Sequence, residues 1–289
     1  MTINEEDIQA YLYTYVEQTT WQIETPQRGF SFGKRFIGIA PDRKVFVRLG
    51  IDPRIIQFLS DVRITPRYLA GGDFFDTCIA VQEYIEAVHP DRKWYAANVT
   101  TWAHMTKKLH SSSALRQYLP PVENETYRTL LAHYIHELKE EYQHVVTGRR
   151  ERDVIEALIA QYEERVPAIQ GAGLVPTHGD PGADNMLIAP TNVYLIDWDS
   201  LHLSDPMRDV AQVLWWMYPR SLWDEMLDLF GIDLTDHQQR ERFYLHMSTR
   251  ALYVSLFFIQ LGHEHWAEKF LRDAQLALEQ QTPDTLLLS

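Results

Sequence analysis

The stretch between Thr177 and Ser200 constrains the fold of this chain more than any other part of the sequence. It places an Asp and an Asn five residues apart, at Asp180 and Asn185, and a second Asp, Asp197, after an apolar run typical of a strand. A loop, a hairpin and a strand end can bring these three oxygen-bearing side chains together. Transfer of a phosphoryl group from ATP needs such a set. One carboxylate must orient and deprotonate the attacking hydroxyl, and two oxygen ligands must hold Mg²⁺ against the phosphates.

The composition is that of a protein large enough for one big domain or two lobes. The chain has 289 residues, of which 45% are hydrophobic, and this allows a sizeable core. Its formal net charge of −13 argues against a nucleic-acid binder, which should present a basic surface. An acidic balance suits a cationic ligand, although maintenance of solubility is the simpler explanation of the total.

Three features predict a cytoplasmic protein. The single cysteine, Cys78, excludes an internal disulfide framework and fits a reducing compartment. The N-terminal residues are acidic and amphipathic, unlike the basic and apolar start of a secretion signal. The longest apolar stretch, 251–261, is shorter than the ~20 residues that a membrane span requires.

Apolar spacing predicts a β-rich segment followed by a mainly helical segment with one hairpin, around 180–197, in its middle. We expect strands at 30–39, 44–49, 67–70 and 77–85, and helices at 4–17, 53–61, 94–110, 127–146, 152–166, 209–217, 221–230, 238–261 and 264–279.

The central stretch also carries three recognisable motifs. Residues His178 to Asn185 match the pattern HGDxxxxN, residues Ile196 to Trp198 match IDW, and DPMRDVA follows at 205–211. With these motifs the chain resembles the aminoglycoside phosphotransferase and choline kinase family, over nearly its whole length.

This resemblance implies an α+β, two-lobed, protein-kinase-like fold. The small β-rich N-terminal lobe would span residues 1–86, with a hinge at about 81–86, and would bind the nucleotide. The larger, mainly helical C-terminal lobe, 87–289, would carry the catalytic loop and the acceptor-binding helices.

The resemblance also assigns roles to the matched positions. Asp180 would be the catalytic base, and Asn185 and Asp197 would hold the Mg²⁺ that bridges the phosphates of ATP or GTP. His178 would brace the catalytic loop, and Asp209, which starts the next helix, would hydrogen-bond back to it. A solvated acidic turn is the alternative reading, but a turn alone does not predict the later apolar-Asp-Trp strand.

Two further carboxylates are ambiguous at this stage. Asp184 precedes Asn185 in the loop and could face solvent. Asp199 lies two residues beyond Asp197, and on an extended strand it would point to the same side, toward metal or substrate. A turn-capping role beside Ser200 is equally compatible with the sequence.

The N-terminal lobe should supply a cation for the phosphates from its third strand. The family often has Lys there, whereas this chain offers Arg48, which can bind phosphate oxygens through two parallel donors. Lys44 lies too early, beside the turn. By spacing, Asp52 is the nearest carboxylate that could pair with Arg48. A surface position is the alternative reading for Arg48.

Two weaker signals concern the nucleotide itself. The segment 28–33, RGFSFG, matches the loop that covers the phosphates, where Gly29 and Ser31 could bring backbone N–H groups close to them. A hairpin turn would look the same. The run VQEYI at 81–85 resembles the hinge, where backbone groups of Glu83 and Ile85 would pair with adenine.

A protein kinase regulated by phosphorylation is a poor match. Gly179 stands where such kinases carry an Arg that responds to the phosphorylated activation loop. Asp205 follows Asp197 by only eight residues, which leaves no room for a long activation segment.

These observations predict ATP-dependent O-phosphorylation of a small molecule, in first place an aminoglycoside-like antibiotic, and therefore a role in antibiotic resistance. The C-terminal third could bind a cationic acceptor through carboxylates and Trp faces, although helix packing is the simpler reading of the Trp pair. The residues concerned are Asp224, Glu225, Asp228, Glu264, Glu268, Trp215, Trp216, Trp223 and Trp266. The alternatives are a metabolic kinase for choline, an amino sugar or a related alcohol, and a nucleotide-binding pseudokinase scaffold.

Overall fold

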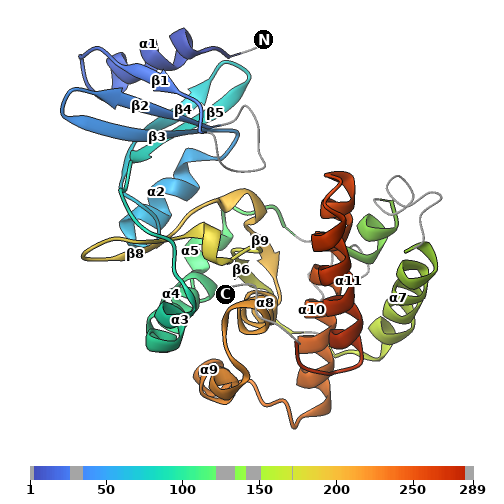
Figure 1. Cartoon of the computed structure of the whole chain (residues 1–289). Helices are drawn as coiled ribbons and strands as arrows, with labels where there is room; N and C mark the ends of the chain where they lie inside the picture. Colours follow the sequence, from blue (N-terminus) through green and yellow to red (C-terminus); the bar gives the residue numbers. More distant parts are fainter. Residues whose placement is uncertain (1–2, 27–34, 122–133, 141–150, 171, 284–289) are drawn as a thin grey trace. The chain divides into compact units, whose positions relative to one another are not determined.

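The chain forms two compact units (Figure 1). Unit 1 comprises Met1–Pro90 and Asp184–Asp199, and unit 2 comprises Asp91–Ala183 and Ser200–Ser289. The segment 184–199, which the sequence analysis assigned to the C-terminal lobe, therefore belongs to the same unit as the N-terminal residues. The structure, a computed structural model, describes residues 3–26, 35–121, 134–140, 151–170 and 172–283.

Unit 1 is built on an antiparallel sheet with the strand order β1-β2-β3-β5-β4. The tight β2–β3 turn sets a register in which Ala40 faces Arg43 and Arg35 faces Arg48. A bulge between Tyr68 and Ala70 interrupts the pairing of β4 with β5. The strands are β1 (Gln22–Glu24), β2 (Arg35–Ala40), β3 (Arg43–Leu49), β4 (Tyr68–Phe74) and β5 (Thr77–Glu83).

Helix α1 (Glu5–Tyr15) covers one face of this sheet. It starts at a capping box in which Asn4 and Asp7 satisfy each other's backbone N–H groups. Its buried residues, Ile8 and Leu12 among them, belong to the same apolar cluster as Val47 of β3. The sheet therefore obtains its core from a helix that precedes it in the chain.

Two further elements complete unit 1. Helix α2 (Pro53–Asp61) has the bounds that the sequence predicted. The hairpin of β7 (Met186–Ile188) and β8 (Val193–Leu195) is joined to unit 1 by backbone hydrogen bonds. Leu195 N donates to Ile64 O at 2.8 Å, and Ile188 N donates to Val88 O at 2.8 Å.

Unit 2 is mainly helical and carries one small sheet, in which β6 (Val175–Thr177) pairs with β9 (His202–Ser204). Its helices are α3 (Arg92–Ala97), α4 (Val99–His110), α5 (Ser113–Arg116), α7 (Arg152–Arg165), α8 (Met207–Met217), α9 (Trp223–Phe230), α10 (His237–Gln260) and α11 (Glu264–Leu278). The turns η1 (Val166–Ala168) and η4 (Arg220–Leu222) are 3₁₀ helices.

The helix predicted at 94–110 is in fact two helices, α3 and α4, which are separated at Asn98. The Asn98 side chain donates to the carbonyl of Trp94 at 2.9 Å. Asn favours such local bonds, which compete with the helix ladder. Most of the helix predicted at 127–146 lies outside the described residues, although 134–140 are helical.

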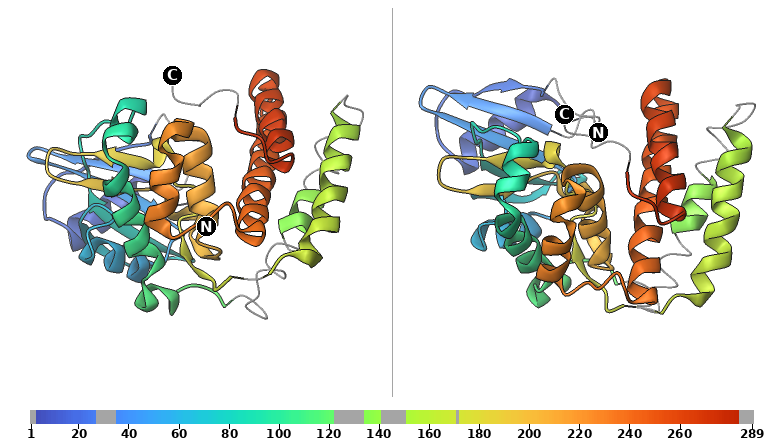
Figure 2. Two further views of the ribbon diagram at one scale, coloured as in Figure 1. Left: turned by 90° about the horizontal axis from the view of Figure 1, so that it is seen from below. Right: turned by 60° about the horizontal axis from the view of Figure 1, so that its bottom comes forward.

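The last two helices of unit 2 run side by side, as the views in Figures 1 and 2 agree. Ser248 and Ser255 of α10 each donate a hydroxyl hydrogen bond to a carbonyl of α11. Phe258 of α10 stacks on Phe270 of α11 with the rings 5.5 Å apart. Helix α11 thereby supports α10, which contributes a residue to the candidate site.

In the part of the chain that the structure describes, no helix is both long enough and apolar enough to cross a membrane.

Candidate active site

The loop that follows β6 carries the HGD motif in unit 2. Gly179 has φ +80°, and a Cβ atom there would lie 2.3 Å from the carbonyl oxygen of Ser200. Both the left-handed backbone and the close approach require glycine. His178 is fully buried, and the backbone N–H of Asp180 donates to its Nδ1 at 3.3 Å. The predicted bracing role of His178 is consistent with this geometry.

Asp209, on α8, anchors the backbone of the same loop. Its carboxylate accepts hydrogen bonds from the backbone N–H groups of His178 and Gly179 and from His110 Nε2, each at 2.9 Å. Burial alone would raise the pKa of Asp209, but the His110 hydrogen bond and the nearby N–H groups hold it at about 2. The prediction that Asp209 hydrogen-bonds back to the catalytic loop is confirmed.

Asp180 is the exposed end of this arrangement. Its Oδ1 accepts a hydrogen bond from Gln212 Nε2 at 2.8 Å, and Arg250 of α10 also lies 2.8 Å from it. Burial alone would raise the pKa of Asp180, but the Arg250 guanidinium and the Gln212 amide outweigh burial and lower it. Since 38% of its side chain stays exposed, a substrate hydroxyl can reach this ionised carboxylate.

The predicted metal ligands lie at one end of the β7–β8 hairpin in unit 1. Asn185 immediately precedes β7, and Asp197 follows β8 by two residues. Ile196 N donates to Asn185 O at 2.9 Å, so the hairpin pairing continues up to both positions. A carboxylate and an amide oxygen are donors that Mg²⁺ accepts. Asp184, which the sequence left ambiguous, is exposed.

Asp197 lies in a cluster of four charged side chains in unit 1. Arg35 and Arg48, which face each other on β2 and β3, approach its carboxylate to 2.8 and 2.9 Å. Asp199 pairs with both arginines, and its distance to Arg35 is 3.2 Å. Burial raises the pKa of Asp199, but the two arginines outweigh this and lower it. Among the described residues, the two positive and two negative charges of this cluster balance.

The backbone at Asp197 is unusual, because its φ is +65°. Asp is among the few non-glycine residues that adopt this left-handed conformation readily. Directly after it, Trp198 is buried, and its indole N–H donates to Thr65 at 3.2 Å. The IDW motif therefore turns the chain sharply and anchors the turn in the core of unit 1.

The predicted partner of Arg48 is wrong. Asp52 caps the N-terminus of α2 and binds the side chain of Arg54, at distances down to 2.6 Å. An Asp before Pro53 is a common helix start, and its capping role could have been read from the sequence. Arg48 itself is 4% exposed, so the surface reading of this residue is also excluded. Lys44 pairs with Glu86 at an exposed position.

Of the residues predicted to contact the nucleotide from the loop and the hinge, the structure describes those at the hinge. Gly29 and Ser31 lie outside the described residues. The N–H of Glu83 already donates to Arg67 O at 2.8 Å, and its carboxylate pairs with Arg67 at 3.4 Å. Ile85 follows the end of β5 and is half-buried. Both remain proposals as adenine-binding residues, with Ile85 the better placed because it lies beyond the strand.

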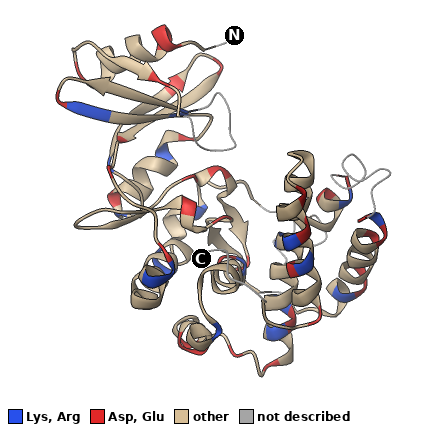
Figure 3. Cartoon of the chain, viewed as in Figure 1, with Lys and Arg blue, Asp and Glu red and all other residues tan. Residues whose placement is uncertain are grey.

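The C-terminal groups predicted for a cationic acceptor divide into two sets. Trp215, Trp216 and Trp223 are buried, which supports helix packing over ligand contact. Trp266 is 39% exposed. The five carboxylates on α9 and α11 are all exposed, and Figure 3 shows acidic residues on α9 and both acidic and basic residues on α11.

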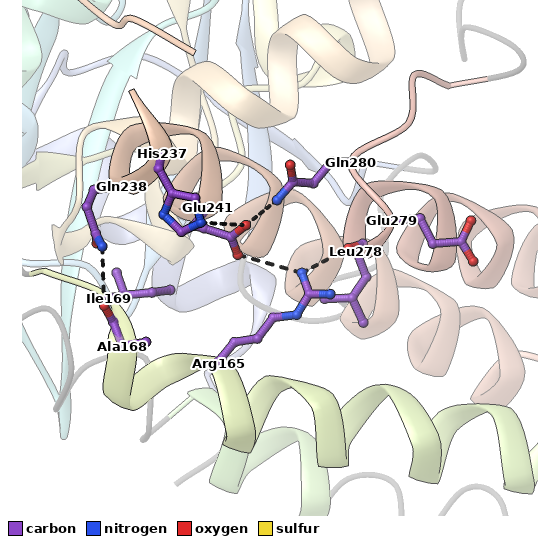
Figure 4. A pocket seen from close by; sticks show the side chains of 9 residues that line it. All are labelled: Arg165, Ala168, Ile169, His237, Gln238, Glu241, Leu278, Glu279 and Gln280. Atoms are coloured by element: carbon purple, nitrogen blue, oxygen red, sulfur yellow. Dashed lines mark hydrogen bonds and ion pairs between the residues drawn. The ribbon is translucent and has the colours of Figure 1, made fainter. Parts of the chain in front are cut away.

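A hollow of about 350 Å³ in unit 2 contains none of the predicted site residues (Figure 4). Its charged groups satisfy one another: Arg165 lies 3.6 Å from Glu241, and Gln280 donates to the same carboxylate. Geometry and chemistry therefore favour the loop around Asp180 over this hollow as the place of reaction.

The sequence analysis missed three residues that touch the predicted site residues. Arg35 could have been found from the β2–β3 hairpin, because the short turn places it opposite Arg48. Gln212 is a polar residue within the apolar run VAQVLWW of α8, which is a signal, whereas Arg250 follows two other polar residues on α10. Only the folded structure shows that both reach Asp180.

Comparison with known proteins places these motifs in context. A family model described as the phosphotransferase enzyme family matches residues 16–244. The fold is similar to that of choline kinase LicA from Streptococcus pneumoniae, with a TM-score of 0.70 and 16% identity. That similarity covers 95% of this chain and 98% of LicA. LicA has also been solved in complex with AMP.

Two further structures are similar over almost their full length. A thermostable mutant of aminoglycoside phosphotransferase APH(4)-Ia gives a TM-score of 0.70 at 12% identity, covering 94% of this chain and 98% of that chain. Choline kinase from Cryptosporidium parvum Iowa II gives 0.69 at 13%, covering 96% and 95%. An APH(4)-Ia variant was solved with AMP-PNP and hygromycin B. These likenesses confirm the predicted α+β, kinase-like fold.

Proposed function

This chain belongs to the phosphotransferase enzyme family and is a small-molecule kinase, and from this premise we propose that it transfers the γ-phosphoryl group of ATP to a hydroxyl group of a small molecule. The observation that carries the proposal is the half-exposed, ionised carboxylate of Asp180 on a loop braced by Asp209. A general base needs this combination of charge, access and fixed position.

Asp180 orients the acceptor hydroxyl and takes its proton as the new O–P bond forms. Gln212 and Arg250 hold the carboxylate in one rotamer, so the base does not have to be ordered during the reaction. The buried Asp209 fixes the backbone on which Asp180 stands.

Unit 1 supplies the groups for the nucleotide. Arg48 and Arg35 bind phosphate oxygens, since guanidinium groups match the geometry of these anions. Asn185 and Asp197 hold Mg²⁺, because their oxygen donors and their common position at one hairpin end fit this cation. When bound, Mg²⁺ would neutralise charge on the phosphates.

The acceptor predicted from the sequence is an aminoglycoside-like antibiotic, with choline, an amino sugar or a related alcohol as the alternative. The support for both is the names of the related structures, which are choline kinases and an aminoglycoside phosphotransferase. These compounds are accordingly the first acceptors to test.

The test is to follow ADP formation from Mg-ATP with a panel of hydroxylated acceptors and to identify the phosphorylated product by ³¹P NMR. We expect at least one acceptor to raise ADP formation well above slow hydrolysis by water. Binding of Mg-ATP without transfer to any acceptor in a broad panel would refute the proposal and favour a nucleotide-binding scaffold.

A further inference from the structure

Arginine side chains lie on α8 and α10, two helices of unit 2 whose side chains contact Asp180. Arg242 and Arg250 lie eight residues apart on α10, which puts them on the same face of the helix. Arg208, on the first turn of α8, is half-buried. These three arginines differ in whether a carboxylate neutralises them.

Arg242 is fully neutralised. It forms two hydrogen bonds of 2.8 Å with the carboxylate of Asp205, which is itself completely buried. His246 lies 3.5 Å from the same carboxylate. This part of the region is a closed structural pair and has no charge left to offer a ligand.

Arg208 is different, because it has no carboxylate within ion-pair distance among the described residues. Its guanidinium lies over the ring of Tyr134, 4.4 Å from the centroid, and 3.1 Å from His202 Nε2. Burial, reinforced by Arg208, lowers the pKa of His202 to about 4, so the imidazole is neutral: its Nδ1–H donates to the Ser200 carbonyl at 2.6 Å, and its Nε2 accepts from Arg208. Among the described residues, Arg208 is therefore not part of an ion pair.

Arg250 has Asp180 as its carboxylate partner, and its guanidinium lies 5.3 Å from the ring centroid of Tyr253. Its Nε is buried and has no hydrogen-bond partner in the part of the chain that the structure describes, and neither has Gln212 Oε1. A donor and an acceptor beside the base are thus left for other groups. Tyr253 is 47% exposed, so this side of α10 is accessible.

An amine-bearing acceptor fits this region poorly. An ammonium group beside the reacting hydroxyl would meet Arg250, and the charge of Asp180 that could attract it is already shared with that arginine. An acidic group would instead meet the Arg250 guanidinium, whose Nε has no hydrogen-bond partner among the described residues. The unused oxygen of Gln212 could accept a hydrogen bond from a hydroxyl of the same molecule.

We propose that the acceptor carries an acidic group, a carboxylate or a phosphate, close to the hydroxyl that is phosphorylated, and that Arg250 binds this group. The inference rests on the proposed kinase function and names its substrate class. Binding of the acid would draw Arg250 toward the acceptor and leave Asp180 to the hydroxyl. Arg250 is thus a specificity-determining residue.

The test uses four probes that share one three-carbon diol skeleton. Glycerate carries a carboxylate, sn-glycerol 3-phosphate a phosphate, glycerol a third hydroxyl and 3-amino-1,2-propanediol an ammonium group. Each is titrated by calorimetry at constant ionic strength into the full chain saturated with Mg-AMP-PNP. We expect at least one acidic probe to bind about tenfold more tightly than glycerol, the gain that hydrogen bonds to a charged group provide.

Variants assign this preference to a residue. Arg250→Gln should remove most of the difference between the acidic probe and glycerol, whereas Arg250→Lys should keep part of it. Arg220→Gln is the matched control, since it removes the same charge from an exposed arginine of the same unit and should change nothing. Comparison of glycerate with sn-glycerol 3-phosphate shows whether a carboxylate or a phosphate is preferred.

Equal or tighter binding of the ammonium probe, or an acid preference that survives in Arg250→Gln, would overturn the inference. Phosphorylation of choline or kanamycin without discrimination between acids and glycerol would likewise overturn it and leave the kinase function standing. The kinase function itself is decided separately, by ADP formation with the broader panel.

Discussion

The two carboxylates of the candidate site, Asp197 in unit 1 and Asp180 in unit 2, are held in different electrostatic surroundings. Among the described residues, Asp197 shares Arg35 and Arg48 with Asp199, so that two positive and two negative charges balance. Asp180 pairs with Arg250 and accepts a hydrogen bond from Gln212. A balanced cluster can exchange its partners for phosphate and metal without leaving a bare charge, whereas the pair of Asp180 and Arg250 offers an arriving anion one guanidinium.

The two carboxylates also differ in how their backbones are fixed. The loop of Asp180 is tied to the buried Asp209 by two N–H hydrogen bonds. Asp197 instead stands at a left-handed turn that Trp198 anchors to Thr65. Rigid placement suits a base that must meet one hydroxyl. From this contrast we expect substitutions in unit 1 to act on the nucleotide, and those in unit 2 to act on turnover and acceptor.

Asp197→Ala should have the largest effect and abolish the Mg²⁺ dependence of nucleotide binding together with turnover, because it removes the main metal ligand. Calorimetric titration of ATP with and without Mg²⁺ measures this. Asp42→Ala, at an exposed turn of the same unit, is the control and should behave as the wild type. Unchanged metal dependence in the Asp197 variant would reduce this residue to a structural turn.

Asp180→Asn should come next, with turnover about 10²- to 10⁴-fold lower, on the scale of general-base loss. Mg-ATP affinity should stay nearly intact, because no nucleotide contact is assigned to this residue. Asp184→Asn in the same loop is the matched control, since its side chain is exposed. Comparable losses in nucleotide affinity for the Asp180 and Asp197 variants would break the contrast between the two units.

Arg48→Ala should raise the KM for ATP about tenfold, the usual cost of one charge-assisted contact, and leave the KM for the acceptor almost unchanged. Arg48→Lys should recover part of the loss, because the charge returns without the planar fork. Lys44→Ala, on the same strand, is the control. If the ATP KM is unaffected in all three variants, another cation binds the phosphates.

The smallest effect concerns pH. Arg250 lowers the pKa of Asp180, so the wild type keeps its base ionised down to a lower pH than an isolated Asp would. Arg250→Gln removes this influence, raises the pKa and should move the acid limb of the kcat profile to higher pH. Arg220→Gln should leave the limb in place. A limb that stays put in both variants would show that Arg250 does not tune the base.

The sequence predicted the parts of this arrangement that are local in the chain. The HGDxxxxN and IDW motifs place Asn185 and Asp197 at one end of a hairpin and Asp180 on the loop before it in the chain, and short-range spacing gives α2 its exact bounds. Contacts between elements far apart in the chain could not be predicted from the sequence. Arg250 lies 70 residues from Asp180, and apolar periodicity shows that α10 has a buried face without showing which loop that face meets.

The wrong partner for Arg48 has the same origin. Spacing suggested Asp52, four residues away, but the start of α2 needs that side chain as a cap. The actual partners, Asp197 and Asp199, lie about 150 residues further along the chain. Asp52 therefore caps the helix next to it, although its spacing would also have allowed an ion pair with Arg48.

Gly179 has a consequence for the evolution of regulation. In protein kinases the corresponding position carries an arginine through which a phosphorylated activation loop controls the catalytic loop. Glycine and arginine codons can differ by a single nucleotide, so mutation offers this change readily. Here the added side chain would collide with the Ser200 carbonyl on a left-handed backbone. A single substitution at this position therefore cannot introduce such control unless the backbone at Ser200 first moves away from residue 179.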